Sequence, residues 1–189
     1  FRSTFYHYFL SNILLRVINL NSLWALALLV FGTNSQIIFF NLADQCYKAL
    51  NALSGSIPAN LYSKYTKSSD FLDAIKIGII ISLLLLASYT IFYLFIDGII
   101  IFFFDTIYHN ATPFIKIYIV SSLFLGLTGI FGFPLLGLLT NASKVKKIIL
   151  FSGVLNLCAL LLWIFFLEKS VINIVLIHLA INIFIFLFQ

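Results

Sequence analysis

Four polar side chains share one face of the otherwise apolar stretch Gln36–Leu61: Asn41, Asp44, Lys48 and Asn51. At about 100° per helical residue they fall within an arc of about 80°. A charge at the bilayer centre costs roughly 2.5–3.5 kcal/mol, so such side chains normally face protein or water. Cations and amides in a dehydrated wall can bind phosphates by charge-assisted hydrogen bonds and sugar hydroxyls by neutral ones. The stripe therefore predicts a wet binding surface that other helices must complete.

The preceding apolar stretch, Tyr8–Phe31, has a similar stripe formed by Asn12, Arg16 and Asn19, within an arc of about 60°. A connection of only about four residues should join the two stretches as an antiparallel hairpin. Counted inward from that connection, Arg16 lies about 22 Å deep and Lys48 about 18 Å deep. Two cations at similar depth, with one carboxylate nearby, favour an anionic ligand. The predicted cavity-lining residues are Arg16, Lys48, Asp44, Asn12, Asn19, Asn41 and Asn51.

Each charge also has a simpler interpretation. Arg16 could extend its side chain to the cytoplasmic surface, and Asp44 and Lys48 could form an i,i+4 ion pair that neutralises itself in a packed bundle. The asparagines on both stripes favour the continuous polar surface, because one buried pair would not need them.

The composition predicts an all-α integral membrane protein. Of the 189 residues, 62% are hydrophobic and 9% are charged, whereas a soluble domain has about 25% charged residues. The apolar runs match the thickness of a bilayer and are too long for the strands of a membrane barrel. The positive charges cluster in a few connections, which is typical of membrane topology signals and not of nucleic-acid binding.

Six transmembrane helices are expected, and the connections between them alternate between basic and neutral. Six crossings with both chain ends on the cytoplasmic side satisfy this alternation; Lys116, at the outer end of the fourth helix, is an exception. Because the chain begins at Phe1 and lacks methionine, we expect it to be a piece of a longer protein. The expected helices are 8–31, 36–61, 77–103, 114–139, 148–167 and 171–188.

Four further residues stand out within the apolar stretches. Asp97 lies near the outer end of the third helix, where we expect an interfacial position. His178 is the one ionisable side chain inside the last two helices; we interpret it as a hydrogen-bonded structural residue, with a proton relay as the alternative. Cys46 and Cys158 lie in apolar runs without a CxxC pattern, and we interpret them as inert small residues.

The fourth helix is rich in glycine. Small residues at short spacing allow close helix packing, and a proline should kink the helix. Gly132 and Pro134 are therefore hinge candidates for a moving half-bundle, with ordinary packing as the alternative. The sequence contains no HExxH motif, no Cys/His cluster and no Gly-rich phosphate loop. We expect no enzymatic activity, no metal and no cofactor.

The stretch Phe9–Lys64 resembles the central part of Wzx-type O-antigen and polysaccharide flippases of the MOP exporter superfamily. The similar elements are Phe9-Leu10-Ser11-Asn12, Leu20-Asn21, the block from Ala43-Asp44 to Lys48-Ala49, and Ser56-Ile57-Pro58 with Leu61-Tyr62-Ser63. Farther along, Phe104 to Tyr108 with Ala111 resembles the family's Phe-Gly-x-x-Tyr-x-x-Ala element, although Asp105 stands where glycine is usual.

The resemblance implies that residues 1–189 form the C-terminal six-helix lobe of a twelve-helix transporter in the bacterial cytoplasmic (inner) membrane. Such a protein would flip a polyprenyl-diphosphate-linked oligosaccharide of lipopolysaccharide or capsule by alternating access. Its implied partners are the lipid-linked substrate, membrane lipids, the N-terminal lobe of the same protein and a polysaccharide polymerase. Asp44 could orient Lys48 or carry a coupling ion, H⁺ or Na⁺.

Other functions stay open at this point. The alternatives are another transporter of the superfamily, such as a lipid II flippase or a cation-coupled drug exporter, and a non-transporting scaffold of polysaccharide assembly whose polar stripes only pack helices. A drug exporter should present more acid and less base. A membrane glycosyltransferase or acyltransferase should have a catalytic carboxylate or histidine in a sizeable loop, which this sequence lacks.

Overall fold

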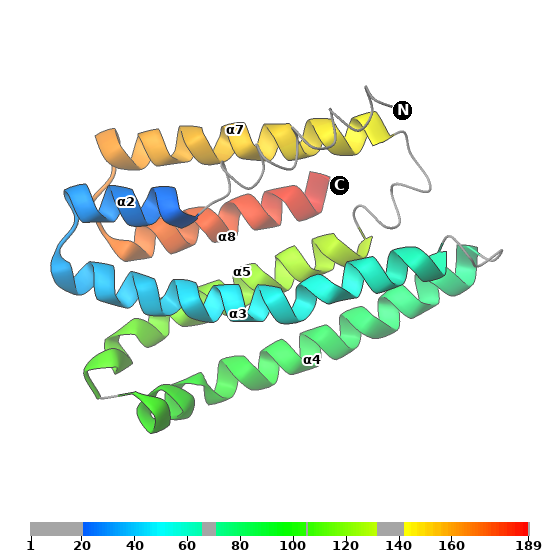
Figure 1. The fold of residues 1–189 in the computed structure, drawn as a ribbon, viewed down its shortest axis with the longest axis horizontal. Helices are drawn as coiled ribbons and strands as arrows, with labels where there is room; N and C mark the ends of the chain where they lie inside the picture. The colour runs from blue at the N-terminus through cyan, green and yellow to red at the C-terminus, as the bar shows by residue number, and fades with distance from the viewer. Residues whose placement is uncertain (1–20, 66–70, 105, 132–141, 189) are drawn as a thin grey trace.

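The computed structural model describes residues 21–65, 71–104, 106–131 and 142–188 (Figure 1). Within these ranges every regular element is helical, which confirms the predicted all-α class. The elements are α2 (Asn21–Phe31), α3 (Asn34–Tyr65), α4 (Phe71–Phe103), the 3₁₀ helix η1 (Thr106–Ala111), α5 (Thr112–Phe131), α7 (Ala142–Phe166) and α8 (Val171–Phe188).

The predicted helix boundaries agree best with the structure where a helix is apolar up to its end. α8 covers the predicted range, 171–188, and α4 ends at Phe103 as expected. α4 begins at Phe71, before the predicted Ile77. Its first turns include the charged residues Asp73 and Lys76, whose side chains pair at 3.3 Å, three residues apart on the exposed helix surface. Hydropathy predicts only the apolar part of a helix, and α4 extends beyond that part through turns that contain charged residues.

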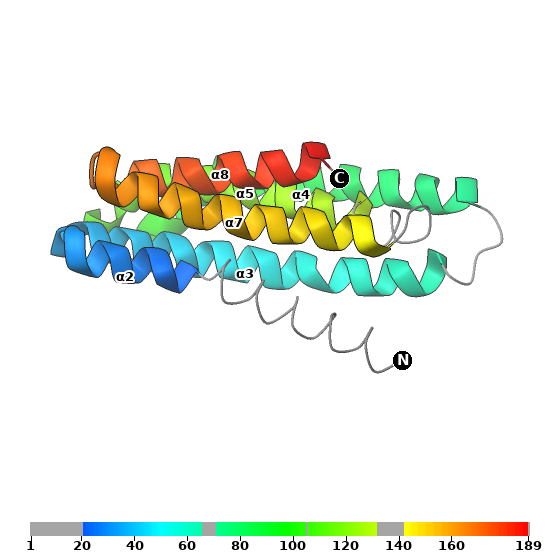
Figure 2. The same cartoon turned by 90° about the horizontal axis from the view of Figure 1, so that it is seen from above.

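The helices run side by side along one long direction, and successive helices are antiparallel (Figures 1 and 2). The connections 32–33 and 167–170 lie at one end of the bundle together with η1. At the opposite end α3 finishes, and α4 and α7 begin. The neutral connections therefore share one end, as the alternation of charge predicts; which end faces the cytoplasm stays a prediction.

Helix α5 has the central position, since it packs against α3, α4, α8 and η1. Its buried face contains small residues, among them Ser121, Ser122 and Gly126. A Cβ atom added at Gly126 would lie 2.8 Å from a side-chain methyl of Leu85 on α4. A larger residue would therefore require the Leu85 side chain to move, which agrees with the expected close packing by small residues at this position.

Among the described residues, three helical stretches are long and apolar enough to cross a membrane: Ile75–Phe103, Thr106–Phe131 and Val171–Phe188. They support the prediction of a membrane protein. Only 17% of the most apolar part of the α4 stretch is buried inside the bundle, which suits a helix that faces lipid. α3 is not among the three, because polar residues interrupt its apolar sequence, and in α7 the apolar part is the shorter Phe151–Phe166. Six crossings stay a prediction.

Two lysines at the neutral end each have local partners. Lys116 on α5 forms an ion pair with Asp97 on α4, with 2.6 Å between Nζ and Oδ2, which accounts for its place at the end where positive charge was unexpected. Lys169 donates hydrogen bonds to the carbonyl oxygens of Trp163 at 2.8 Å, Ile164, and Leu167 at 3.4 Å. It therefore satisfies the free carbonyls at the C-terminus of α7, where the helix dipole favours a cation.

Candidate functional site

The residues of the predicted polar stripe of α3 differ in their exposure in the structure. Asp44 is buried, with 6% of the residue exposed, and Asn51 is half-buried. Asn41 is exposed, as is the Lys48 side chain, of which 57% is exposed although Nζ lies 2.5 Å from Oδ2 of Asp44. The i,i+4 ion pair considered as the simpler interpretation is therefore present. In this pair most of the Lys48 side chain is exposed, whereas the Asp44 side chain is buried.

The other predicted site residues, Arg16, Asn12, Asn19, Gly132 and Pro134, lie outside the described residues. The cation pair of Arg16 and Lys48 and the hinge in the fourth helix therefore stay predictions.

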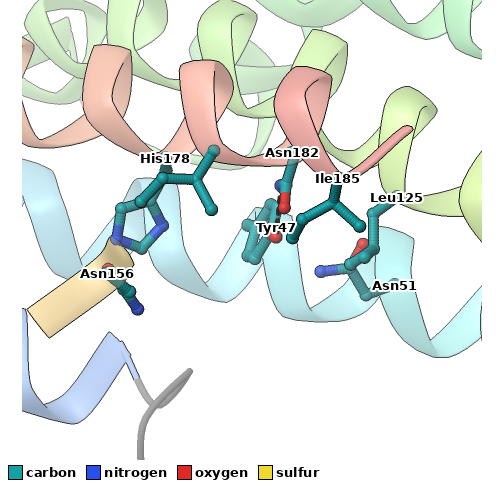
Figure 3. A pocket seen from close by; sticks show the side chains of 8 residues that line it. Tyr47, Asn51, Leu125, Asn156, His178, Asn182 and Ile185 are labelled. Carbon is teal, nitrogen blue, oxygen red and sulfur yellow. Dashed lines mark hydrogen bonds between the residues drawn. The ribbon is translucent and has the colours of Figure 1, made fainter. Parts of the chain in front are cut away.

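A partly open cavity of about 200 Å³, with several polar side chains in its walls, lies beside α3 (Figure 3). Four helices supply its walls, and amide, phenol and imidazole groups alternate there with aliphatic side chains. Of the predicted stripe, Asn51 lines it. The lining residues are Tyr47 and Asn51 from α3, Leu125 from α5, Asn156 from α7, and His178, Ile181, Asn182 and Ile185 from α8.

Asn182 holds three helices together at one side of the cavity. Its Nδ2 donates to the hydroxyl of Tyr47 on α3 at 3.1 Å and to Oγ of Ser121 on α5 at 2.7 Å. The same amide approaches the Ser121 carbonyl oxygen at 3.4 Å. A buried amide that reaches two neighbouring helices fixes their register, because displacing it would leave polar groups unsatisfied in an apolar interior.

A second interhelical bond lies at the other side of the cavity. Nε1 of Trp24 on α2 donates to Oδ1 of Asn156 on α7 at 3.1 Å. The Trp24 ring also contacts Trp163 edge-on, with 6.0 Å between the ring centres. The hairpin partner of α3 is thereby joined to α7, and this bond positions the Asn156 side chain at the cavity wall.

His178 is packed among aromatic rings. Its ring centre lies 5.5 Å from that of Trp24, 5.7 Å from that of Tyr118 and 6.5 Å from that of Tyr47, all in edge-to-face geometry. Nε2 is buried and has no hydrogen-bond partner among the described residues, so the expectation of a hydrogen-bonded histidine is not met at this atom.

Asn51 has a similar unsatisfied atom. Its Oδ1 is buried and has no hydrogen-bond partner within the described part of the chain, although the residue lines the cavity. Unpaired buried polar groups are costly, and in native proteins they normally have a partner. Water, or a ligand with hydroxyl groups, would supply hydrogen-bond partners to both Asn51 and His178. The cavity is therefore suited to uncharged polar groups, with the Asp44–Lys48 pair about one helical turn away.

Sequence reasoning missed most of this cavity, namely Tyr47, Asn156 and Asn182, and it gave His178 only a structural role. A signal was present: His178 and Asn182 are four residues apart on the last helix, so they share a face of a helix whose other residues, apart from Asn173 in the first turn, are apolar. Polar residues on one face of a transmembrane helix indicate a functional or packing surface even when they carry no charge.

No protein-family model, no curated protein and no solved structure matches this chain. The site therefore rests on its own geometry. In the described ranges no group of three or more His, Cys, Asp or Glu side chains could hold a metal ion.

Proposed function

We propose that this chain is the C-terminal six-helix lobe of a twelve-helix MOP-type transporter, which flips a polyprenyl-diphosphate-linked oligosaccharide across the bacterial cytoplasmic membrane by alternating access. The observation that carries the proposal is the polar cavity inside an apolar bundle, with two of its buried polar atoms unpaired within the described chain. The resemblance of Phe9–Lys64 to Wzx-type flippases supports the same function.

The cavity residues and the charged stripe would have separate tasks in transport. Asn51, Asn156, Asn182 and the Tyr47 hydroxyl would bond sugar hydroxyls, since amides and phenols both donate and accept. Lys48, whose side chain is 57% exposed, would turn from Asp44 toward the diphosphate as the cargo enters. The charge-assisted bonds to phosphate would be the stronger ones.

Alternating access requires two lobes, so the lobe alone should not transport. In the full-length protein the second lobe would close the exposed side of the cavity, and the polyprenyl tail would stay in the bilayer between the lobes. Asp44 would hold Lys48 when the site is empty. A coupling proton or sodium ion on Asp44 is the alternative role, and Asp44 is buried as such a role requires.

Substitution of the two cations tests this function. In the full-length protein, Lys48→Ala and Arg16→Ala should abolish surface polysaccharide while the protein level in the membrane stays unchanged. Lys76→Ala is the matched control, because Lys76 also pairs with an aspartate on its own helix but lies at the exposed start of α4. Surface polysaccharide that survives both Lys48→Ala and Arg16→Ala would contradict the transport proposal.

A non-transporting scaffold is the second candidate, and the Asn182 network favours it. Two hydrogen bonds from one buried amide, one to α3 and one to α5, are also expected of a residue that only packs helices. A scaffold would tolerate Lys48→Ala, because the Lys48 side chain is 57% exposed and pairs with Asp44 on its own helix. It would be damaged by Asn182→Leu, so the two substitutions separate the candidates.

A further inference from the structure

A second polar pocket lies between α4 and the start of α5, at the end of the bundle with the neutral connections. Its volume is about 320 Å³. No residue of α4 lines the cavity described above, so the two sites are separate. This pocket is lined by Asp97, His109, Asn110, Thr112, Pro113 and Lys116.

Opposite charges and a buried hydroxyl meet in this pocket. The Asp97 carboxylate and Lys116 ammonium are 2.6 Å apart, yet 41% of the Asp97 side chain and 30% of the Lys116 side chain are exposed. Thr112 is buried, with 2% of the residue exposed, and its Oγ1 has no hydrogen-bond partner among the residues that the structure describes. Both charged groups can therefore bind a ligand. The same ligand would supply the missing hydrogen-bond partner of the Thr112 hydroxyl.

A separate, mostly apolar groove of about 200 Å³ also lies between α4 and α5, a contact here called the α4–α5 seam. On α4 the spacing from Asp97 back to Tyr93, Thr90 and Tyr89 is four, seven and eight residues, so these residues share one face. On α5 the residues Ile119, Val120 and Leu123 follow Lys116 at three, four and seven positions, again on one face. Nζ of Lys116 lies 5.5 Å from the Tyr93 ring centre, which connects the two sites. The groove is lined by Tyr89, Thr90, Tyr93, Ile119, Val120 and Leu123.

The position along the helices matches a membrane interface. Asp97 is six residues before the end of α4 at Phe103, or about 9 Å along the axis. The groove extends about 12 Å deeper, from Asp97 to Tyr89. At the α4–α5 seam, the pocket with charges of both signs therefore lies near the end of a membrane-spanning stretch, and the apolar groove lies deeper along the helices.

We propose that the α4–α5 seam binds one phospholipid with a phosphoethanolamine headgroup. The ammonium of the lipid bonds to Asp97, and its phosphate bonds to Lys116 and to the hydroxyl of Thr112. One acyl chain lies in the groove against Tyr93 and Val120. Charge complementarity selects this headgroup: a net-negative lipid would be repelled by Asp97, and a choline headgroup has no N–H to donate to it. The inference does not depend on the proposed transport function.

Lipid binding to the purified full-length protein tests the seam. Native mass spectrometry would compare phosphatidylethanolamine, phosphatidylglycerol and phosphatidylcholine with identical acyl chains, and free phosphoethanolamine as the soluble headgroup. We expect phosphatidylethanolamine to bind about tenfold more tightly than either other lipid, because it alone satisfies both charges. Equal binding of the three lipids overturns the headgroup assignment, and equally tight binding of free phosphoethanolamine overturns the role of the groove.

Thr112→Val separates ligand binding from folding. The substitution keeps the shape of the side chain and removes a hydroxyl that has no partner among the described residues. We expect an unchanged or slightly raised unfolding temperature and a several-fold loss of phosphatidylethanolamine affinity. A lowered unfolding temperature with unchanged lipid affinity would show a purely structural hydroxyl and would overturn the proposal.

Matched variants localise the binding. The double substitution Asp97→Asn/Lys116→Gln should reduce phosphatidylethanolamine affinity about tenfold. The same change at the exposed pair of α4, Asp73→Asn/Lys76→Gln, should have no effect, because that pair lies beside none of the groove residues. Equal losses from the two double variants would contradict a site at the α4–α5 seam.

Discussion

The Asn182 network makes a quantitative prediction for Asn182→Leu. The change keeps the approximate volume and removes the donor that joins α8 to Tyr47 at 3.1 Å and to Ser121 at 2.7 Å. An interhelical hydrogen bond in a membrane protein contributes about 0.6 kcal/mol on average and about 1.7 at most. Two such bonds give a loss of about 1–2 kcal/mol, and the unfolding temperature should fall by about 2–8 °C for a chain of this size.

Thermal unfolding of the detergent-solubilised protein, followed by circular dichroism, is the assay. Asn173→Leu is the matched control, because Asn173 lies on the same helix with a single exposed bond to the Glu168 carbonyl at 3.1 Å; we expect a change within about 0.5 kcal/mol. In a double-mutant cycle, Asn182→Leu and Ser121→Ala should be non-additive by about 0.5 kcal/mol or more. Additive effects, or an Asn182 effect no larger than that of Asn173, would refute the bridging role.

Three further substitutions probe the packing of the bundle, each by its unfolding temperature. Asp97→Asn alone should destabilise more than Asp97→Asn/Lys116→Gln, by about 1 kcal/mol, because the single change leaves a partly buried lysine unpaired. Gly126→Val should destabilise by about 1–3 kcal/mol and be partly rescued by Leu85→Ala, since the added atoms meet the Leu85 methyl; no rescue would contradict this contact. Lys169→Gln should cost about 0.5–1 kcal/mol by exposing the carbonyls at the end of α7, and an unchanged temperature would contradict the cap.

Local patterns predicted the helices well, because an apolar run of bilayer length has few other structures available. The range of α8 and the end of α4 follow from hydropathy alone. The Asp44–Lys48 ion pair was foreseen as an alternative, since four residues bring two side chains together on any helix. What these predictions share is that each depends on residues close in sequence.

The cavity could not be predicted in the same way, because its walls come from segments far apart in the chain. Asn182 bonds to residues 61 and 135 positions away, and Trp24 bonds to Asn156 across 132 positions. Helical periodicity shows which face of each helix is polar, but not which faces meet. Which faces meet is decided by the central position of α5. That position depends on the close helix approach that Gly126 and the small serines allow, and hydropathy does not take this into account.

Access of water to the cavity is the most direct test of the central claim, that the bundle encloses a polar site open to a hydrophilic ligand. In the full-length protein with Cys46→Ala and Cys158→Ala, Asn51→Cys would be treated with a membrane-impermeant maleimide on intact cells and on inverted vesicles. Leu83→Cys, on the exposed apolar face of α4, is the lipid-facing control. We expect Asn51→Cys to be labelled in at least one preparation and Leu83→Cys in neither. An Asn51→Cys variant that is labelled from neither side would contradict a water-accessible cavity.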